Sequence, residues 1–272
     1  MKKFINRRPA NAARWALGML PFVLLLIIYM LASDARLAEN PNDKLLPALD
    51  TFVQAIERMA FEPSKRTGDY LMLNDTMASL QRLAIGVGIS ALVALMVGIG
   101  NGTIPLIRAT FSPLVTGLSL VPPMAILPVL FIVFGLGELA KVMLIIIGIT
   151  PFMIRDLQQR ALEIPAEQII KMQTLGANTW QIITRLVWPQ LMPRLIGVVR
   201  LSLGPAWLFL IAAEAIAATD GLGYRIFLVR RYLAMDVILP YVMWITLLAF
   251  AIDFILSRYS QWRYPWFHGG KS

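Results

Sequence analysis

An uncharged run of 19 residues, from Trp15 to Ser33, constrains this chain more than any other feature of its sequence. A helix needs about 20 predominantly apolar residues to cross the hydrocarbon core of a bilayer. The composition agrees, because 15% charged against 58% hydrophobic residues leaves too little charge for an ordinary soluble surface. We therefore expect an all-α integral membrane protein with about six transmembrane helices, near residues 15–33, 79–100, 111–134, 142–154, 195–218 and 237–256.

The basic residues predict how the chain crosses the membrane. Residues 1–14 carry five bases and no acid, which places the N-terminus in the cytoplasm, because Lys and Arg gather on cytoplasmic flanks. The stretch 155–200, with six bases and three acids, also points inside, and so does the tail 258–272. The loop 219–236 argues mildly against this topology, since it places three bases and two acids outside. We predict a multi-pass protein of the bacterial inner (plasma) membrane with both termini in the cytoplasm.

A cleaved signal peptide is the alternative for residues 15–33. Ser33-Asp34-Ala35 resembles a small-residue cleavage site, but the apolar run exceeds the usual length of about 7 to 15 residues. The net charge of +9 does not require nucleic acid, because basic cytoplasmic flanks also meet anionic lipid. We therefore favour a retained first helix, membrane lipid as a partner and no nucleic acid.

Residues 34–74 form a polar segment with seven acids and five bases, a balance that suits the periplasmic side. Within this segment, apolar residues recur at helical spacing at Phe52, Val53, Ile56, Met59 and Ala60. The pattern predicts a short amphipathic helix that lies on the outer surface of the membrane.

Four prolines interrupt the third apolar stretch, residues 111–134. Each proline lacks an N–H and clashes with the preceding turn, so Pro113, Pro122, Pro123 and Pro128 cannot share one uninterrupted helix. Broken backbone persists in lipid only where protein or a water-filled cavity satisfies its polar groups. The stretch is therefore either a wall or gate of a translocation pathway, or a kinked packing helix.

Three charged residues fall within or near the ends of the predicted spans, where a charge is costly unless it is paired or wetted. Arg82, near the outer end of the second span, either reaches water by snorkelling or faces the pathway. Glu214 either lines the pathway or braces its helix. Asp253, one turn from the cytoplasmic end, is expected to form an interfacial ion pair with Arg258.

The cytoplasmic stretch 163–188 has the pattern of two short helices rather than of a flexible connection. Pro165 suits a first helical position, and Gly176 suits the end of a helix. Asn178 or Thr179 can cap a second helix, residues 180–187, which Pro189 would end. Apolar residues remain uncovered on this helix pair, so we expect it to dock on a partner.

The same stretch resembles a known family. Leu175-Gly176-Ala177-Asn178 and Leu186-Val187-Trp188-Pro189 resemble the cytoplasmic signature of binding-protein-dependent ATP-binding-cassette (ABC) importer permeases. The Glu-Ala-Ala that opens the family signature falls on Ile170-Lys171-Met172, and Trp188 replaces Leu, so Glu167 is the candidate for the acidic contact. Other motifs resemble the taurine, aliphatic sulfonate and nitrate branch: Ala78 to Leu83, Pro122-Pro123 through Pro128, Gly204-Pro205-Ala206-Trp207, Ala212-Ala213-Glu214, Gly221-Leu222-Gly223-Tyr224 and Pro265-Trp266.

The resemblance implies a type I ABC importer permease of the MetI-like fold, with residues 75–257 as the permease core. The implied partners are two copies of an ABC ATPase subunit, a second copy of the permease, and a periplasmic or lipid-anchored substrate-binding protein. ATP and Mg would be held by the ATPase and no cofactor by this chain, and the substrate would be a small anion such as taurine, a sulfonate or nitrate.

The resemblance also assigns candidate residues to three roles. Those expected to couple to the ATPase are Glu167, Ile170, Lys171, Leu175, Gly176, Ala177, Trp180 and Pro189. The candidates for the pathway or its gate are Arg82, Pro122, Pro123, Met124, Pro128, Trp207 and Glu214. The candidates for contact with the binding protein are Tyr224, Arg225, Arg230 and Arg231.

The sequence lacks the residues that an enzyme or a metal site would need. It has no cysteine and one histidine, His268, which argues against Cys/His metal sites and thiol catalysis. Gly269-Gly270-Lys271-Ser272 imitates the end of a phosphate-binding loop, but Pro265 stands in the place of its first glycine. An ion-coupled secondary transporter remains the alternative, although the inverted repeats and paired intramembrane acids typical of that class are not evident.

Overall fold

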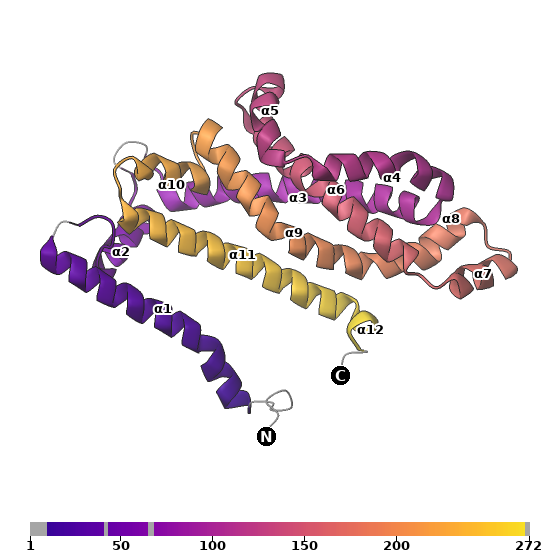
Figure 1. Cartoon of the computed structure of the whole chain (residues 1–272), viewed down its shortest axis with the longest axis horizontal. Helices are drawn as coiled ribbons and strands as arrows, with labels where there is room; N and C mark the ends of the chain where they lie inside the picture. Colours follow the sequence, from indigo (N-terminus) through magenta and orange to yellow (C-terminus); the bar gives the residue numbers. More distant parts are fainter. Residues whose placement is uncertain (1–9, 41–42, 65–67, 270–272) are drawn as a thin grey trace.

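The computed structural model describes residues 10–40, 43–64 and 68–269, and every regular element within these ranges is helical (Figure 1). The basic N-terminal residues Lys2, Lys3, Arg7 and Arg8 lie outside the described residues, and so do residues 270–272 at the end of the tail. The all-α expectation is therefore confirmed for the described part of the chain.

Six long helices form the body of the molecule, joined by shorter ones. The long helices are α1 (Asn11–Glu39), α3 (Leu71–Thr103), α4 (Pro105–Leu120), α6 (Glu138–Leu162), α9 (Trp188–Ala217) and α11 (Met235–Arg263). The shorter helices are α2 (Leu49–Ile56), α5 (Leu127–Phe134), α7 (Ala166–Thr174), α8 (Thr179–Ile182), α10 (Leu222–Arg230) and α12 (Pro265–His268). A π-helical segment, Glu57–Phe61, continues α2, and another, Ile183–Val187, joins α8 to α9.

The long helices include the predicted membrane spans. Within the described ranges, four helices are long and apolar enough to cross a bilayer, or five if the bent pair formed by 105–120 and 123–134 counts as one span. The other predicted span, near residues 142–154, lies in α6. The uncharged part of α6 between Lys141 and Arg155 is only 13 residues long. The connection between the second and third predicted spans is short, because α3 continues to Thr103 and α4 begins at Pro105.

Glycines let α3, α6 and α9 approach closely at the centre of the bundle. A Cβ atom on Gly98 would lie 2.8 Å from Leu157 Cβ, and one on Gly102 would lie 2.2 Å from Ala161 Cβ. On the other side of α6, a Cβ on Gly148 would lie 2.4 Å from the ring of Phe209 in α9. Small residues permit this packing where hydrophobicity cannot drive helices together in lipid.

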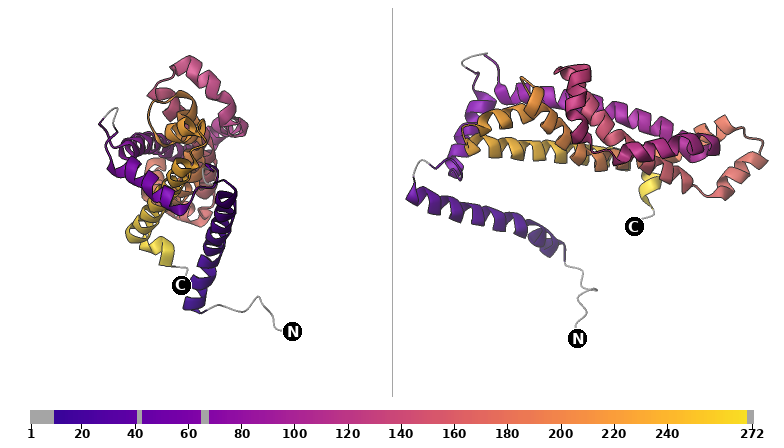
Figure 2. Two further views of the ribbon diagram at one scale, coloured as in Figure 1. Left: turned by 90° about the vertical axis from the view of Figure 1, so that its left-hand side faces the viewer. Right: turned by 45° about the horizontal axis from the view of Figure 1, so that its top comes forward.

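Helix α1 stands apart from the other long helices over most of its length (Figures 1 and 2). Only 6% of its apolar window is buried, against 44% for α3. Its C-terminal part is tied to the segment before α2, where Tyr29 Oη donates to the carbonyl oxygen of Pro47 at 2.7 Å and Ser33 Oγ donates to that of Leu46 at 2.9 Å. The surface of α1 is therefore free to contact lipid or another chain.

The proline-rich stretch is broken as its sequence indicates. Helix α4 and the segment 123–134 are bent by 83° relative to each other, and Pro122 and Pro123 lie at the break. Pro128 lies in the first turn of α5, where a missing N–H costs nothing, and Pro113 lies inside α4. The prolines therefore divide the stretch into two helices rather than ending it.

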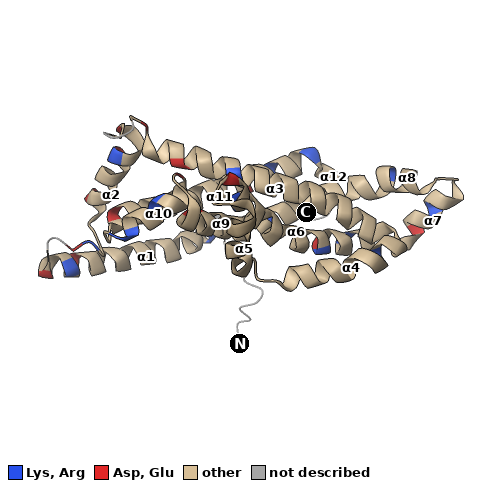
Figure 3. Ribbon diagram, turned by 90° about the horizontal axis from the view of Figure 1, so that it is seen from above, with Lys and Arg blue, Asp and Glu red and all other residues tan. Residues whose placement is uncertain are grey.

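Charged residues lie at both ends of the long axis and also near its middle, whereas α1 has a long uncharged stretch (Figure 3). Helices α7 and α8 lie at one end of the long axis, and α2 and α10 lie at the other (Figure 1). This distribution agrees with a bundle that crosses the bilayer along its long axis.

Replacing Gly102 with alanine should destabilise the protein, because the Cβ of Ala161 is fixed to its backbone and α3 and α6 would have to separate. Overpacking of this kind costs about 1–3 kcal/mol. Gly88→Ala, on the same helix, meets no atom within 4 Å and should be neutral or slightly stabilising. Thermal unfolding of both variants in detergent measures the difference, and equal midpoints would contradict the α3–α6 contact.

Candidate functional site

The predicted docking corner is a helix end with a defined backbone structure. Gly176 follows α7 with φ = +80°, the left-handed conformation that glycine adopts without strain. The backbone N–H of Gly176 donates to the carbonyl of Gln173 at 2.9 Å, and that of Ala177 donates to the carbonyl of Met172 at 3.0 Å. This pair of bonds is the Schellman motif, which satisfies the last carbonyls of a helix and fixes the direction of the chain that leaves it.

The second helix of the corner starts at a reciprocal cap. Asn178 Oδ1 accepts from the backbone N–H of Gln181 at 2.8 Å, while Gln181 Oε1 accepts from the backbone N–H of Asn178 at 2.9 Å. This capping box satisfies two backbone donors that the helix leaves unpaired. Of the two predicted caps, the structure therefore selects Asn178 rather than Thr179.

The sequence suggested that Pro189 would end this second helix, but the helix continues past it. It lies in the first turn of α9, and the π-helical segment 183–187 joins α8 to α9 without a break. A π-helical turn accommodates a proline because it rearranges the hydrogen bonds that the missing N–H would otherwise leave open. Residues 179–217 therefore form one helical rod of 39 residues that begins at the corner and enters the bundle.

The corner presents apolar side chains outward. Leu175 is 75% exposed and Trp180 is 71% exposed, and Ile170 on α7 is also exposed. Glu167, Lys171, Gly176 and Pro189 are exposed as well, whereas Ala177 is half-buried against the core. Seven of the eight coupling candidates are thus accessible, but nothing in this chain alone tests their contact with an ATPase, which stays a prediction.

A buried ion network lies toward the opposite end of the bundle. Arg82 on α3 donates to Glu214 Oε1 on α9 at 2.8 Å, and Glu214 is fully buried. Arg82 also binds Glu138 at the start of α6, at 2.5 Å, and Asp220 in the loop before α10. Lys141 Nζ contacts Glu138 at 2.6 Å. One guanidinium therefore joins a buried carboxylate to two carboxylates near the surface.

Neutral donors complete the shell around Glu214. Ser79 Oγ donates to it at 2.8 Å, and the backbone N–H of Gly223 donates at 2.8 Å. Both glycines of the Gly221-Leu222-Gly223 motif leave no room for a side chain. A Cβ on Gly221 would lie 2.6 Å from the Glu214 carboxylate, and one on Gly223 would lie 2.7 Å from the carbonyl of Ile211. The motif therefore lets the backbone bind a buried carboxylate.

A second ion pair extends the network to α10 and α11. Arg225 Nε donates to Asp75 Oδ2 at 2.8 Å, and the hydroxyl of Tyr241 donates to the same oxygen at 3.2 Å. The backbone N–H of Gly221 donates to Asp75 Oδ1 at 3.0 Å. Helices α3, α6, α9, α10 and α11 are therefore held together by one set of polar contacts.

The network corrects several predictions. Arg82 is 4% exposed and does not snorkel to water, and of the two roles open to Glu214, the structure shows the bracing one. The side chain of Arg225 is 15% exposed and paired with Asp75, and its contact with a binding protein stays a prediction. Asp253 pairs with Arg200 on α9 at 2.8 Å, not with Arg258.

The remaining candidates lie in several places. Trp207 is buried, with its Nε1 atom unpaired within the described part of the chain. Pro122, Pro123, Met124 and Pro128 lie at the break between α4 and α5, and Met124 is 41% exposed. Tyr224 is half-buried, whereas Arg230 and Arg231 at the end of α10 are exposed. These roles stay predictions.

Sequence analysis missed Asp75 and Ser79, which are central to the network. A signal was available, because Asp75, Ser79 and Arg82 are spaced by four and three residues and so share one face of α3. Three polar residues on one face of an apolar helix indicate a polar partner face inside the bundle. The partners on α9 and α10 are 132 to 150 residues away in the chain, so no local pattern identified them.

The fold and these sites define a class of protein: a multi-pass helical membrane protein with a structured corner that protrudes from one end. The sequence comparison is more specific, since residues 86–263 match the family described as "Binding-protein-dependent transport system inner membrane component". The chain belongs to this family.

Curated relatives agree with this membership. The taurine transport system permease protein TauC of Escherichia coli (strain K12) is 33% identical over 192 residues, which cover 71% of this chain and 70% of the relative. The bicarbonate transport system permease protein CmpB of Synechocystis is 27% identical, covering 83% of this chain and 79% of the relative. The putative aliphatic sulfonates transport permease protein SsuC of Bacillus subtilis is 30% identical over 57% of this chain and 56% of the relative.

A solved structure shows the fold. A chain of the inward-facing MetNI methionine ABC transporter superposes with a TM-score of 0.63 at 21% identity, covering 73% of this chain and 98% of that one. The protein therefore has the MetI-like permease fold and is the permease subunit of an ABC importer rather than an enzyme. Membership implies an ATPase subunit and a substrate-binding protein as partners. Within the described residues, no group of three or more His, Cys, Asp or Glu side chains could hold a metal ion.

Removing Arg82 should destabilise the protein strongly, because it leaves Glu214 buried without its cation. Breaking a buried ion pair from one side costs about 3–5 kcal/mol. Arg160→Met is the control, since Arg160 pairs with Asp156 at 3.5 Å and is 41% exposed, and exposed pairs contribute about 0–1 kcal/mol. Unfolding in detergent compares Arg82→Met with this control, and a similar loss for both variants would contradict the bracing role.

Proposed function

We propose that this permease works as a homodimer with two ATPase subunits and imports a small anion that an external binding protein delivers. Closure of the ATPase would move the corner formed by α7 and α8 and so switch the pathway between inward-open and outward-open. The observation that carries this proposal is the continuous rod of residues 179–217. Its first turns form the exposed corner, and its last turn holds Glu214 in the ion network.

The rod supplies a mechanical connection between the two ends of the protein. Displacement of the corner cannot be absorbed by a loop between α8 and α9, because the backbone is helical throughout. At the far end, Glu214 is bound to α3 through Arg82 and to α10 through Gly223. A tilt of the rod would therefore also move α3 and α10.

The same arrangement supports an orientation. The corner would lie in the cytoplasm, together with both termini, and α2 and α10 would lie at the periplasmic end. Arg230 and Arg231, exposed at the end of α10, and the half-buried Tyr224 would then face a docking binding protein. The isolated surface of α1 would be available to the second copy and to lipid.

The proposed substrate follows from the relatives. The names of three similar permeases mention taurine, bicarbonate and aliphatic sulfonates. These compounds share a small head group with oxygen atoms that carry a negative charge. We propose the same class for this importer, with taurine, a sulfonate or nitrate as examples. ATP and Mg would bind the ATPase partner, and this chain would hold no cofactor.

Co-expression with the cognate ATPase tests the assembly. A complex that purifies with two copies of each subunit, and that hydrolyses ATP in liposomes in a vanadate-sensitive, binding-protein-stimulated manner, is the expected result. Anion uptake by the purified permease alone would contradict the proposal. Labelling of the corner from the periplasmic side would contradict the orientation.

Gly176→Leu should leave the protein inserted and folded but abolish stimulated ATP hydrolysis. A Cβ at this position meets no atom within 4 Å, so the effect comes from the backbone, whose φ of +80° disfavours L residues. Gly176→Asn is the matched control, because asparagine tolerates the left-handed region. Stimulated hydrolysis should be largely retained in the Asn variant, and full stimulation in the Leu variant would count against the corner as the coupling element.

A further inference from the structure

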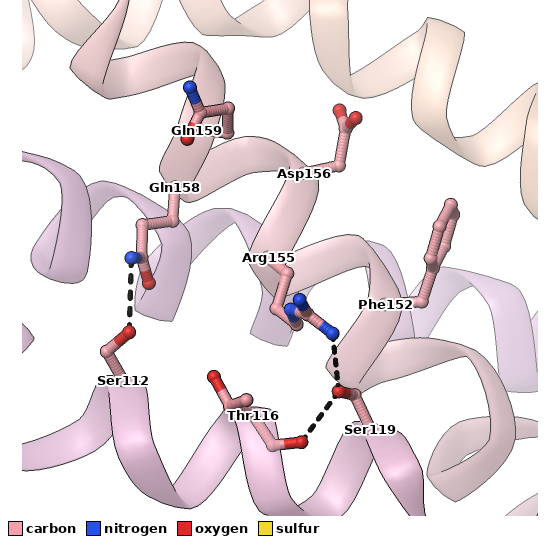
Figure 4. A pocket seen from close by; sticks show the side chains of 8 residues that line it. All are labelled: Ser112, Thr116, Ser119, Phe152, Arg155, Asp156, Gln158 and Gln159. Carbon is pink, nitrogen blue, oxygen red and sulfur yellow. Dashed lines mark hydrogen bonds between the residues drawn. The ribbon is translucent and has the colours of Figure 1, made fainter.

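A polar cavity of about 540 Å³ opens between α4 and α6 (Figure 4). This volume lies within the roughly 300–1,000 Å³ typical of ligand sites. Hydroxyl side chains from α4 form one wall, at Ser112, Thr116 and Ser119, and polar side chains from α6 together with Phe152 form the other. The three hydroxyl residues are spaced by four and three positions, so they share one face of α4.

The cation in this cavity lacks a carboxylate partner. Arg155 on α6 donates from Nη1 to Ser119 Oγ at 2.8 Å, and no ion pair joins it to an acid anywhere in the described part of the chain. Asp156 is the only acid among the lining residues; it points away from Ser119 in Figure 4 and pairs with Arg160 at 3.5 Å. The guanidinium of Arg155 is thus bound only to a neutral hydroxyl.

The surrounding donors are neutral and flexible. Gln158 Nε2 donates to Ser112 Oγ at 3.2 Å across the cavity, and Ser119 Oγ donates to the carbonyl of Thr116 at 2.8 Å. Hydroxyl and amide groups can rotate to bind a ligand oxygen at little cost. The guanidinium offers a planar pair of donors that fits an oxyanion.

The position of the cavity ties it to the pathway. Ser119 is one residue before the end of α4, immediately below the 83° break at Pro122 and Pro123. Broken backbone in lipid requires a water-filled or protein-lined space, and the exposed Arg155 side chain lines such a space here. Two independent features, the break and the unpaired arginine, therefore meet at the same cavity.

We infer that the cavity between α4 and α6 is an anion subsite on the transport path, with Arg155 as its cation and the hydroxyls of Ser112, Thr116 and Ser119 as neutral ligands. The subsite takes a small monovalent oxyanion. This inference rests on the proposed function, since it supplies a passage for the proposed substrate. A single guanidinium that pairs with no acid among the described residues can hold one negative charge and release it, as a transport site must.

The cysteine-free sequence allows a direct test on the full-length permease purified with its ATPase. Ser119→Cys introduces a single thiol into the cavity, and Leu118→Cys, one residue earlier at a 51% exposed position, is the matched control. Each variant is labelled with (2-sulfonatoethyl) methanethiosulfonate, an anion, and with the trimethylammonioethyl reagent, a cation. Both labelling rates depend on the reactivity of the thiol, so their ratio reports the charge preference alone.

We expect the anionic reagent to react with Ser119→Cys faster than the cationic one by about tenfold, because a nearby unpaired charge concentrates ions of opposite sign. Adding Arg155→Gln should bring the ratio near that of Leu118→Cys, whereas Arg155→Lys should retain the preference and Arg160→Gln should not change it. Nitrate, methanesulfonate or bicarbonate should slow the labelling of Ser119→Cys more than chloride does.

Three results would overturn the subsite: no labelling of Ser119→Cys, a ratio equal to that of Leu118→Cys, or a ratio that Arg155→Gln leaves intact. Co-purification of the ATPase and stimulated ATP hydrolysis are measured on the same preparations. If the ATPase co-purifies and ATP hydrolysis is stimulated but the labelling shows no charge preference, the anion subsite is wrong and the proposed function stands. If the preference is present but no ATPase binds, the proposed coupling fails and the anion subsite stands.

Discussion

The contact between Arg82 and Glu214 is the interaction on which the rest of the structure depends. A carboxylate buried inside a helical bundle persists only when a cation and directed donors surround it. Here one guanidinium, one serine hydroxyl and the backbone N–H of Gly223 supply that shell. Because these groups come from α3, α9 and α10, satisfying one buried charge also fixes how the helices stand relative to each other.

This constraint gives the long rod of residues 179–217 two anchored ends. At one end Glu214 holds it in the ion network, and at the other the Schellman turn and the capping box define its corner with α7. A rod that is continuous between two defined contacts transmits displacement, whereas a loop would absorb it. In the proposed function, this rod would carry movement from the ATPase partner into the bundle.

Three arginines of the bundle, Arg82, Arg225 and Arg155, differ in their partners and in their exposure. Arg82 and Arg225 bind carboxylates that are themselves buried, so their charges are neutralised within the fold. Arg155 contacts a hydroxyl and faces a cavity, which is why we propose it as the cation of an anion subsite. The difference between the two kinds of arginine therefore lies in what each guanidinium faces, a buried carboxylate or an open cavity.

The sequence alone determined the features that depend on local chemistry. Apolar lengths set the helical membrane class, four prolines predicted the broken third stretch, and Gly176 marked the helix end of the corner, because these effects act within a few residues. The cap of the next helix was narrowed to Asn178 or Thr179, and the structure selected Asn178. Tertiary structure decided what depends on distant partners. It paired Arg82 with Glu214 across 132 residues, Arg225 with Asp75 across 150, and Asp253 with Arg200. It also continued a helix through Pro189, since packing and a π-helical turn override a local stop signal, and it left Arg155 facing a cavity because no acid lies opposite it.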